Sequence, residues 1–410
     1  MNILIVSVSP RHGSIGNIVS VLRKGYESAG HKVKICYGFH GDNIENGVYH
    51  KITPNWEFKL SALLTRLTGL EGIFNPIATL RLFNIIKVFN PDVVHLTNIH
   101  AYWLNEYSLL KYLKRNRIPT IYTMLDEYPF LGKCAFSFQC GKYKTGCGNC
   151  PDIKRYPQAW FFDKTATIYN WKMKAYHNFE NLYMVGGIGV IDKASKAPLL
   201  RDHPITMINE PQDFDGLFYY RKTDNLRKNL GIPAGHKVIM CIASLRDDRK
   251  GGHYFLNVCK RMKDVPDISF VYVGFNTEKY GKPDNLITIP FVTSIDKIVE
   301  FYSMADLLFF GSKADTTPNT ILQSLGCGTP VICFDIEGIS CMGINDRNVL
   351  NMVPLENLNA VEMAFRNVAL KTEYVRDKCR KAVYSSFGAQ NIVNQYLCLI
   401  DNITTKHNCY

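Results

Sequence analysis

The sequence lacks a long apolar run and a basic leader. Its first nine residues are mostly apolar, but no positive charge precedes them and the run is too short for a signal peptide. No stretch of about 18 apolar residues occurs, so no segment is predicted to span a membrane. The sequence also lacks an interleaved basic and aromatic repeat and any nucleic-acid-binding motif, so nucleic acid is not an expected partner.

The chain has fewer acidic than basic residues. The chain has 36 Asp and Glu against 48 Lys and Arg, which gives a formal net charge of +12. Such a charge favours an anionic partner, and nucleoside diphosphates, lipid pyrophosphates and an anionic membrane surface all qualify. A plain role in solubility is the alternative.

Disulfides are not expected, although the chain has 13 cysteines. Cys36, Cys241 and Cys333 lie in apolar strand patterns, where a free thiol behaves as a small hydrophobic group. Without a leader, the reducing cytoplasm is the expected compartment, with the inner face of the cell membrane as a peripheral location.

Strand and helix patterns alternate along most of the chain. A chain of 410 residues is too long for one core, and 46% hydrophobic with 20% charged residues is typical of a globular protein. Alternating units of this kind build parallel sheets with right-handed crossovers. We therefore predict an α/β fold with two Rossmann-like domains, residues 1–208 and 209–385, followed by a helix and tail over 386–410. The strands are expected at residues 2–9, 32–37, 118–123, 182–190, 204–208, 237–244, 268–274, 286–289, 306–310 and 330–335.

Residues 313–335 are the most informative stretch. They are predicted to form a polar loop, a short helix with a glycine-marked end, and a buried strand. Asn319 and Thr320 fall near the helix N-terminus, where free N–H groups attract a phosphate. Asp315 and Gln323 stand two turns apart if the helix starts early. The stretch predicts half of a nucleotide site at the carboxyl edge of a parallel sheet, and an ordinary helix–strand connection is the alternative.

The same stretch resembles the family 4 retaining nucleotide-sugar glycosyltransferases, which carry Glu-x7-Glu and a helix that ends in Ala-x-Gly-x-Pro-Val. The two acidic positions are here Asp315 and Gln323. The resemblance implies that Asp315 lies near the donor sugar as a catalytic residue, and that Gln323 binds the ribose hydroxyls without the strength of a carboxylate. It also implies the glycosyltransferase B architecture, in which two Rossmann-like domains face each other across a cleft. The helix over 386–410 would then cross back to the first domain.

A cationic loop over residues 244–252 lies between a predicted strand and a predicted helix. Such a loop at the start of a helix is suited to a diphosphate. The resembled family has an Arg and a Lys-Gly pair here, which assigns Arg246 and Lys250 to donor binding, with Arg249 as the alternative arginine. A solvated run of charges is the other interpretation.

Polar residues also follow predicted strands in the first half. The loop at 9–17 contains Gly16, and in the resembled family this loop faces the acceptor and the transferred sugar; a plain tight turn is the alternative. His95 and His100 are expected to emerge at the carboxyl end of a strand, where open α/β sheets place their sites.

The strand at 118–123 leads into Leu125, Asp126 and Glu127. Members of the resembled family often have His-Asp here, so Leu125 occupies the histidine position. The resemblance assigns Asp126 a catalytic contact to the donor sugar or the acceptor, and Glu127 is the second candidate.

Four cysteines with the spacing C-x5-C-x6-C-x2-C form a cluster: Cys134, Cys140, Cys147 and Cys150. Four thiolates can surround one tetrahedral zinc ion and leave no open position for catalysis. Packed free thiols and disulfides are the alternatives. The tract resembles a capsule and exopolysaccharide branch of family 4, of colanic-acid type, with Gly-x-Cys and Lys-x-Gly-Cys-Gly-x-Cys-Pro. We expect a structural loop beside the acceptor site, with zinc as its candidate ligand.

Residues 56–90 combine a helical apolar pattern with scattered Lys and Arg. A helix that exposes aromatic and basic groups can lie on an anionic membrane. Packing of the apolar residues onto the sheet is the interpretation that we favour.

These patterns predict a glycosyltransferase that moves a sugar from a nucleoside diphosphate sugar to a growing, lipid-linked cell-surface glycan, with retention of configuration as the resemblance implies. Catalysis is expected to need no metal, because cations and N–H groups neutralise the diphosphate. One alternative is a nucleotide-sugar epimerase. The other is an inactive sugar- or nucleotide-binding relative, which is supported by Leu125 and Gln323 at positions where the resembled family usually has a polar or acidic residue.

Overall fold

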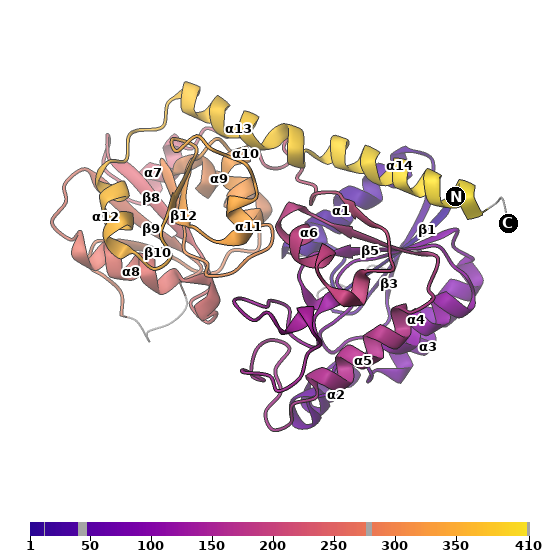
Figure 1. Ribbon diagram of the computed structural model, residues 1–410. Helices are drawn as coiled ribbons and strands as arrows, with labels where there is room; N and C mark the ends of the chain where they lie inside the picture. The colour runs from indigo at the N-terminus through magenta and orange to yellow at the C-terminus, as the bar shows by residue number, and fades with distance from the viewer. Residues whose placement is uncertain (12, 40–46, 276–280, 408–410) are drawn as a thin grey trace. The chain divides into compact units, whose positions relative to one another are not determined.

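The computed structural model describes residues 1–11, 13–39, 47–275 and 281–407, and the chain forms two compact units (Figure 1). The first unit comprises Met1–Pro211 and Gln390–Tyr410, and the second comprises Gln212–Ala389. Each unit has its own parallel sheet with helices on its faces, which is the α/β fold that the sequence predicts.

The sheet of the first unit has seven parallel strands in the order β3-β2-β1-β4-β5-β6-β7. Its central strands are almost continuously apolar, as expected for a parallel sheet that is covered on both faces. The strands are β1 (Asn2–Ser7), β2 (Lys32–Tyr37), β3 (Tyr49–Lys51), β4 (Val93–Leu96), β5 (Thr120–Met124), β6 (Leu182–Gly186) and β7 (Ile205–Met207).

Two large hydrophobic clusters form most of the core of this unit, one including residues of α3, α4 and α5 and the other residues of α1 and α14. A third, small cluster contains Ala62, Ala101 and Tyr102. The terminal helix contributes Ile392, Tyr396, Ile400 and Ile403, whose spacing places them on one helix face, so it completes the core of the first unit. The helices are α1 (Gly13–Ser28), α2 (Asn55–Thr68), α3 (Pro76–Phe89), α4 (Glu106–Arg115), α5 (Thr165–Tyr176), α6 (Ile188–Ser195) and α14 (Ala389–His407).

The sheet of the second unit has six parallel strands in the order β10-β9-β8-β11-β12-β13. They are β8 (Lys237–Ile242), β9 (Ile268–Val273), β10 (Leu286–Ile289), β11 (Leu307–Phe310), β12 (Val331–Phe334) and β13 (Leu350–Val353). The helices are α7 (Asp224–Asn229), α8 (Gly252–Arg261), α9 (Ile295–Met304), α10 (Asn319–Gly326), α11 (Glu337–Ser340), α12 (Leu358–Arg366) and α13 (Glu373–Phe387).

The order of connection reverses once in each sheet, between β1 and β4 in the first unit and between β8 and β11 in the second. Open α/β sheets bind their ligands outside the carboxyl ends of the strands at such a switch point. The loops that follow these four strands are therefore the places to look for a site.

Several predicted boundaries are wrong. The strand expected over 182–190 ends at Gly186, because Gly187 begins the short helix α6. The apolar pattern over 56–90 is two helices, α2 and α3, interrupted at residues 69–75. The strands β3 and β13 are not predicted, since each is only three or four residues long and carries little periodic signal.

Candidate functional site

Two glycines bring the loops of the second switch point together. Gly251, in the loop after β8, has a positive φ of 63°, and a Cβ placed on it would lie 1.8 Å from the carbonyl oxygen of Gly311, in the loop after β11. The backbone N–H of Lys313 also donates to the carbonyl of Arg249 at 2.8 Å. The two loops are therefore in direct backbone contact at the carboxyl edge of the sheet.

This contact places Lys250 beside Asp315. The Lys250 Nζ lies 3.0 Å from Asp315 Oδ2, and the guanidinium of Arg249 lies 3.6 Å from the same oxygen. The Lys250 side chain remains about one-third exposed, whereas Asp315 is largely covered. Arg249 also pairs with Asp247 at 3.2 Å, so the four side chains balance in charge, and Lys250 is the more exposed of the two cations.

The two candidate arginines of this loop have different surroundings. The side chain of Arg249 donates to the carbonyl of Ala314 at 2.8 Å, which ties the two loops together, and to Asp247 of its own loop at 3.2 Å. Arg246 is exposed, and its backbone N–H donates to Ser244 Oγ at 3.3 Å. Arg249 therefore supports the loop, and Arg246 is the arginine that has room to reach a ligand.

The helix after this loop begins at Asn319, so Asp315 lies in the loop and the expectation that it stands two helical turns from Gln323 is wrong. Thr320 is half-buried in the first turn, where backbone N–H groups lack helical acceptors. Asn319 Oδ1 accepts a hydrogen bond from Gln212, and Gln323 is buried with its Oε1 3.4 Å from the Tyr302 hydroxyl.

In the first unit, His100 in the loop after β4 and Asp126 in the loop after β5 form a buried pair. His100 Nε2 lies 2.7 Å from Asp126 Oδ2, and Asn98 donates to the same oxygen at 3.3 Å. The other oxygen of Asp126 accepts the backbone N–H of Tyr128 at 3.0 Å, and the Tyr128 ring stacks on His100. The structure thus joins two predicted residues from different loops in one hydrogen-bonded network.

Glu71 supports this network and was missed by the sequence analysis. One of its oxygens accepts the backbone N–H groups of Ala101 and Tyr102 at 2.9 and 3.0 Å. Both of these residues have left-handed φ angles, 78° and 74°, which are costly for residues other than glycine. Burial raises the pKa of the Glu71 carboxyl. A single Glu between two helices carries no periodic signal that would have identified it.

His95 does not emerge from the strand end, and that expectation is wrong. It lies inside β4, fully buried, with Nδ1 3.0 Å from the Tyr26 hydroxyl and Nε2 2.8 Å from Thr123 Oγ1. Burial lowers the pKa of His95 to about 3. Both ring nitrogens are occupied within the core, so the side chain has a structural position.

Gly16 and Glu127 also have clear contacts within the first unit. A Cβ on Gly16 would lie 2.3 Å from the carbonyl carbon of Arg11, so close packing of the loop on α1 requires glycine. Glu127 is buried and accepts from the backbone N–H of Ser137 at 2.6 Å and from Lys193 at 2.9 Å. Glu127 therefore anchors the cysteine-rich loop to α6.

The four cysteines of the cluster line one small cavity of about 20 Å³, and each is a free thiol: Cys134, Cys140, Cys147 and Cys150. This volume is enough for a single small occupant. As placed, however, no group of three or more His, Cys, Asp or Glu side chains among the described residues is arranged to hold a metal ion. Zinc stays a prediction.

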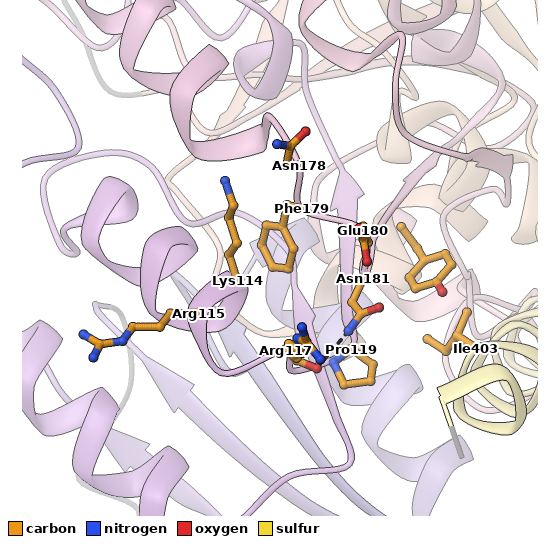
Figure 2. A pocket seen from close by; sticks show the side chains of 10 residues that line it. Lys114, Arg115, Arg117, Pro119, Asn178, Phe179, Glu180, Asn181 and Ile403 are labelled. Atoms are coloured by element: carbon orange, nitrogen blue, oxygen red, sulfur yellow. Dashed lines mark hydrogen bonds between the residues drawn. The ribbon is translucent and has the colours of Figure 1, made fainter. Parts of the chain in front are cut away.

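A larger cavity of about 620 Å³ lies at the amino ends of β5 and β6, between Arg117, Asn181 and Ile403 of α14 (Figure 2). The Asn181 side chain donates to the Arg117 carbonyl at 2.9 Å. This cavity is at the edge of the sheet opposite to the switch point, so it is not part of the candidate site.

Comparison with known proteins finds a family match within the second unit. Residues 236–369, which include both Lys250 and Asp315, match the family described as glycosyl transferases group 1. The matched segment lies entirely within the second unit. The whole chain is similar to WcaC of Escherichia coli K12, whose name assigns it to colanic acid biosynthesis as a glycosyl transferase, with 23% identity over 98% of this chain and 100% of WcaC.

Solved structures confirm the glycosyltransferase B fold of both units. Sucrose-phosphate synthase from Thermosynechococcus elongatus matches with a TM-score of 0.71 and 15% identity over 99% of this chain and all of that one. HepE from Anabaena, solved with UDP and glucose, matches with a TM-score of 0.65 and 14% identity over 98% and 100% of the two chains. None of the described helices is long and apolar enough to cross a membrane.

Proposed function

We propose that this protein is a glycosyltransferase that moves a sugar from a nucleoside diphosphate sugar to a growing cell-surface glycan. The observation that carries the proposal is the Lys250–Asp315 pair at the switch point of the second unit, inside the segment that matches group 1 glycosyltransferases. The structural likeness to HepE, which was solved with UDP and glucose, supports the donor class.

The donor diphosphate would bind to the second unit through charge. Lys250 and Arg246 supply cations, and the N-terminus of α10 at Asn319 and Thr320 supplies backbone N–H groups. These groups stabilise the charge that develops on the leaving diphosphate, so the transfer needs no metal ion.

Asp315 would lie next to the transferred sugar, because it is held by Lys250, which binds the neighbouring phosphate. Gln323, which lies on α10, would hydrogen-bond the ribose hydroxyls. In a transfer with retention, the leaving phosphate oxygen accepts the proton of the acceptor hydroxyl, so a histidine at position 125 is not required.

The acceptor would bind to the first unit near His100 and Asp126. Asp126 fixes one nitrogen of His100, and the other, Nδ1, has no hydrogen-bond partner among the residues that the structure describes. Gly16 lies at the start of α1, next to the loop of the same switch point. The name of WcaC, a colanic acid biosynthesis glycosyl transferase, supports a polysaccharide acceptor. We propose further that this acceptor is carried on a lipid and that the enzyme is peripheral at the cytoplasmic face of the membrane.

A structural zinc ion held by Cys134, Cys140, Cys147 and Cys150 belongs to the same proposal. All four thiols reach one cavity, and bound zinc would order a loop that has little core of its own.

The decisive experiment compares Lys250→Ala with Lys263→Ala, an exposed lysine of the same unit outside the site. Thermal stabilisation by a panel of nucleotide sugars identifies the donor, and transfer is then followed with a glycan acceptor. Lys250→Ala should lower kcat/KM by about 100-fold or more, and Lys263→Ala should not change it.

Full activity of Lys250→Ala would overturn the diphosphate assignment. Consumption of the donor without an acceptor would indicate an epimerase, and nucleotide binding without any turnover would indicate an inactive relative.

A further inference from the structure

The helix α2 exposes large apolar residues along one face. Its buried residues are mainly small or polar: Glu57, Ser61, Ala62 and Thr65. Four of its large apolar residues, Trp56, Leu60, Leu63 and Leu67, are exposed, with Trp56 exposed to 58%. The other two, Phe58 and Leu64, are half-buried. The spacing of the four exposed residues, by four, three and four positions, places them in one stripe along the helix. The expectation that the apolar residues of this region pack on the sheet and on each other is therefore wrong for these four residues, whereas Phe58 of the same helix packs against the core.

A second exposed apolar segment lies beside this stripe. The backbone N–H of Trp160 donates to the carbonyl of Arg66 at 2.7 Å, and the Arg66 guanidinium lies 6.0 Å from the Trp160 ring. A Cβ on Gly69, at the end of α2, would lie 2.2 Å from the Phe162 carbonyl oxygen. Residues 160–162 are thus held against the C-terminal end of α2, with Phe161 exposed to 64%.

Together these seven residues form what we call the apolar face: Trp56, Leu60, Leu63, Leu67, Trp160, Phe161 and Phe162. Single exposed apolar residues are ordinary, but soluble monomers rarely expose a contiguous group of this kind unless it binds something.

The exposed charged side chains next to the apolar face are mostly positive. Lys59 on α2 and Lys164 next to Phe162 are exposed. The only acid of α2, Glu57, is buried and accepts the backbone N–H groups of Ile77 and Ala78 at the start of α3. Asp163 is exposed, but its carboxylate accepts the N–H groups of Cys150 and Thr165. Of these four charged side chains, Lys59, Lys164 and Asp163 are exposed, so positive charge exceeds negative charge by one at this surface.

We infer that the apolar face docks this glycosyltransferase onto an anionic phospholipid membrane. An amphipathic helix that lies in the membrane interface exposes large apolar side chains with flanking Lys or Arg, as α2 does. The flanking lysines match the negative surface of such a membrane. The inference deepens the proposed function, because a lipid-linked acceptor is reached at this surface.

The test is cosedimentation of the full chain with vesicles of phosphatidylcholine alone and of phosphatidylcholine with one-quarter phosphatidylglycerol. The wild type should bind the anionic vesicles more strongly. The double variants Leu60→Gln/Leu63→Gln and Phe161→Ser/Phe162→Ser should each lose binding by about tenfold or more, since each removes two inserted apolar side chains. Lys59→Gln should lose about fivefold, and only on anionic vesicles.

The matched control is Met363→Gln on α12 of the second unit, because Met363 is as exposed as Phe161 but lies outside the apolar face. Vesicle binding by this variant should be unchanged. All substituted residues are exposed, so folding should be retained. The inference would be overturned if the wild type bound neither kind of vesicle. It would also be overturned if Met363→Gln lost as much vesicle binding as the double variants. A lipid-free dimer, seen by sedimentation velocity and lost in both double variants, would instead make the face a contact between copies.

Transfer to a soluble, lipid-free acceptor separates this inference from the proposed function. The double variants should keep that activity, because their residues lie outside the donor and acceptor sites. Vesicle binding that fails while soluble transfer persists would remove the docking surface and leave the proposed function in place.

Discussion

The two switch points share one topology but are built from different chemistry. In the second unit, Lys250 is about one-third exposed beside a largely covered Asp315, and glycine contacts bring their loops together. In the first unit, His100 and Asp126 are buried, and Glu71 holds the loop beside them in a left-handed conformation. An open charged cluster suits a mobile, highly charged ligand such as a diphosphate. A buried network suits a neutral ligand that must be oriented by hydrogen bonds.

The difference shows that connection order locates a site without deciding what it binds. The sheet order brings two loops together in each unit, and the side chains on those loops then determine the ligand. Substitutions that act on one switch point and not the other should separate the two roles.

The largest expected effect comes from Gly251→Ala. The new Cβ would meet the Gly311 carbonyl at 1.8 Å, so the two loops must separate, and nucleotide binding should be lost. The control is Gly235→Ala, which has a similar positive φ of 81° but no neighbour within 4 Å. The control should lose only about 1 kcal/mol of stability, from backbone strain. Urea unfolding and nucleotide titration measure both effects. Equal behaviour of the two variants would show that the loop contact is unimportant.

A smaller effect is expected for Asp126→Asn in the first unit. The amide keeps the shape but no longer holds His100 through a charge, so kcat/KM should fall by about 10- to 100-fold at unchanged nucleotide affinity. Asp192→Asn, an exposed acid on α6, should leave both unchanged. Loss of nucleotide affinity in the Asp126 variant would contradict the separate roles of the two units.

His95 should make the first unit sensitive to acid. Its folded-state pKa is about 3, below the unfolded value of 6.5, so the unfolded state binds a proton first as the pH falls. Its contribution to stability is therefore complete at pH 7.5 and falls by about 1.4 kcal/mol at pH 5.5. In His95→Gln this part of the pH dependence should disappear, whereas the exposed His177→Gln should retain it. Urea unfolding at both pH values decides the matter, and parallel pH dependences of all three proteins would refute it.

The smallest effect is expected from the cysteine cluster. If zinc is bound, the purified protein contains about one zinc ion per chain, and Cys147→Ser should release it and lower the Tm by about 2–4 °C. Cys398→Ser, an exposed thiol on α14, should do neither. Metal analysis and thermal unfolding measure both. Protein that contains no zinc, with equal Tm values for the two variants, would show that the thiols are simply packed.

Much of the fold was predictable because parallel strands carry a strong local signal. Apolar runs such as those at β1, β2 and β9 predicted the strands, and the alternation predicted the two sheets. Weak elements were missed where the signal was short, as in β3 and β13, or where one pattern covered two helices, as at residues 56–90.

The candidate site was predicted only in part. The resemblance to family 4 indicated Lys250 and Asp315, which the structure brings within 3.0 Å of each other, and their roles stay predictions. His95 was placed wrongly because a buried polar residue inside a strand looks like one at its end. Glu71 could not be found, because its partners lie 30 residues away in a loop of unusual backbone conformation.

The sequence alone determined the local elements, the excess of positive charge and the glycines at the loop contacts, since these follow from residue type and near neighbours. Only the tertiary structure decided which polar residues are buried, which loops meet, and that the apolar stripe of α2 faces outward. Those properties depend on contacts between residues far apart in the chain, and no local pattern specifies them.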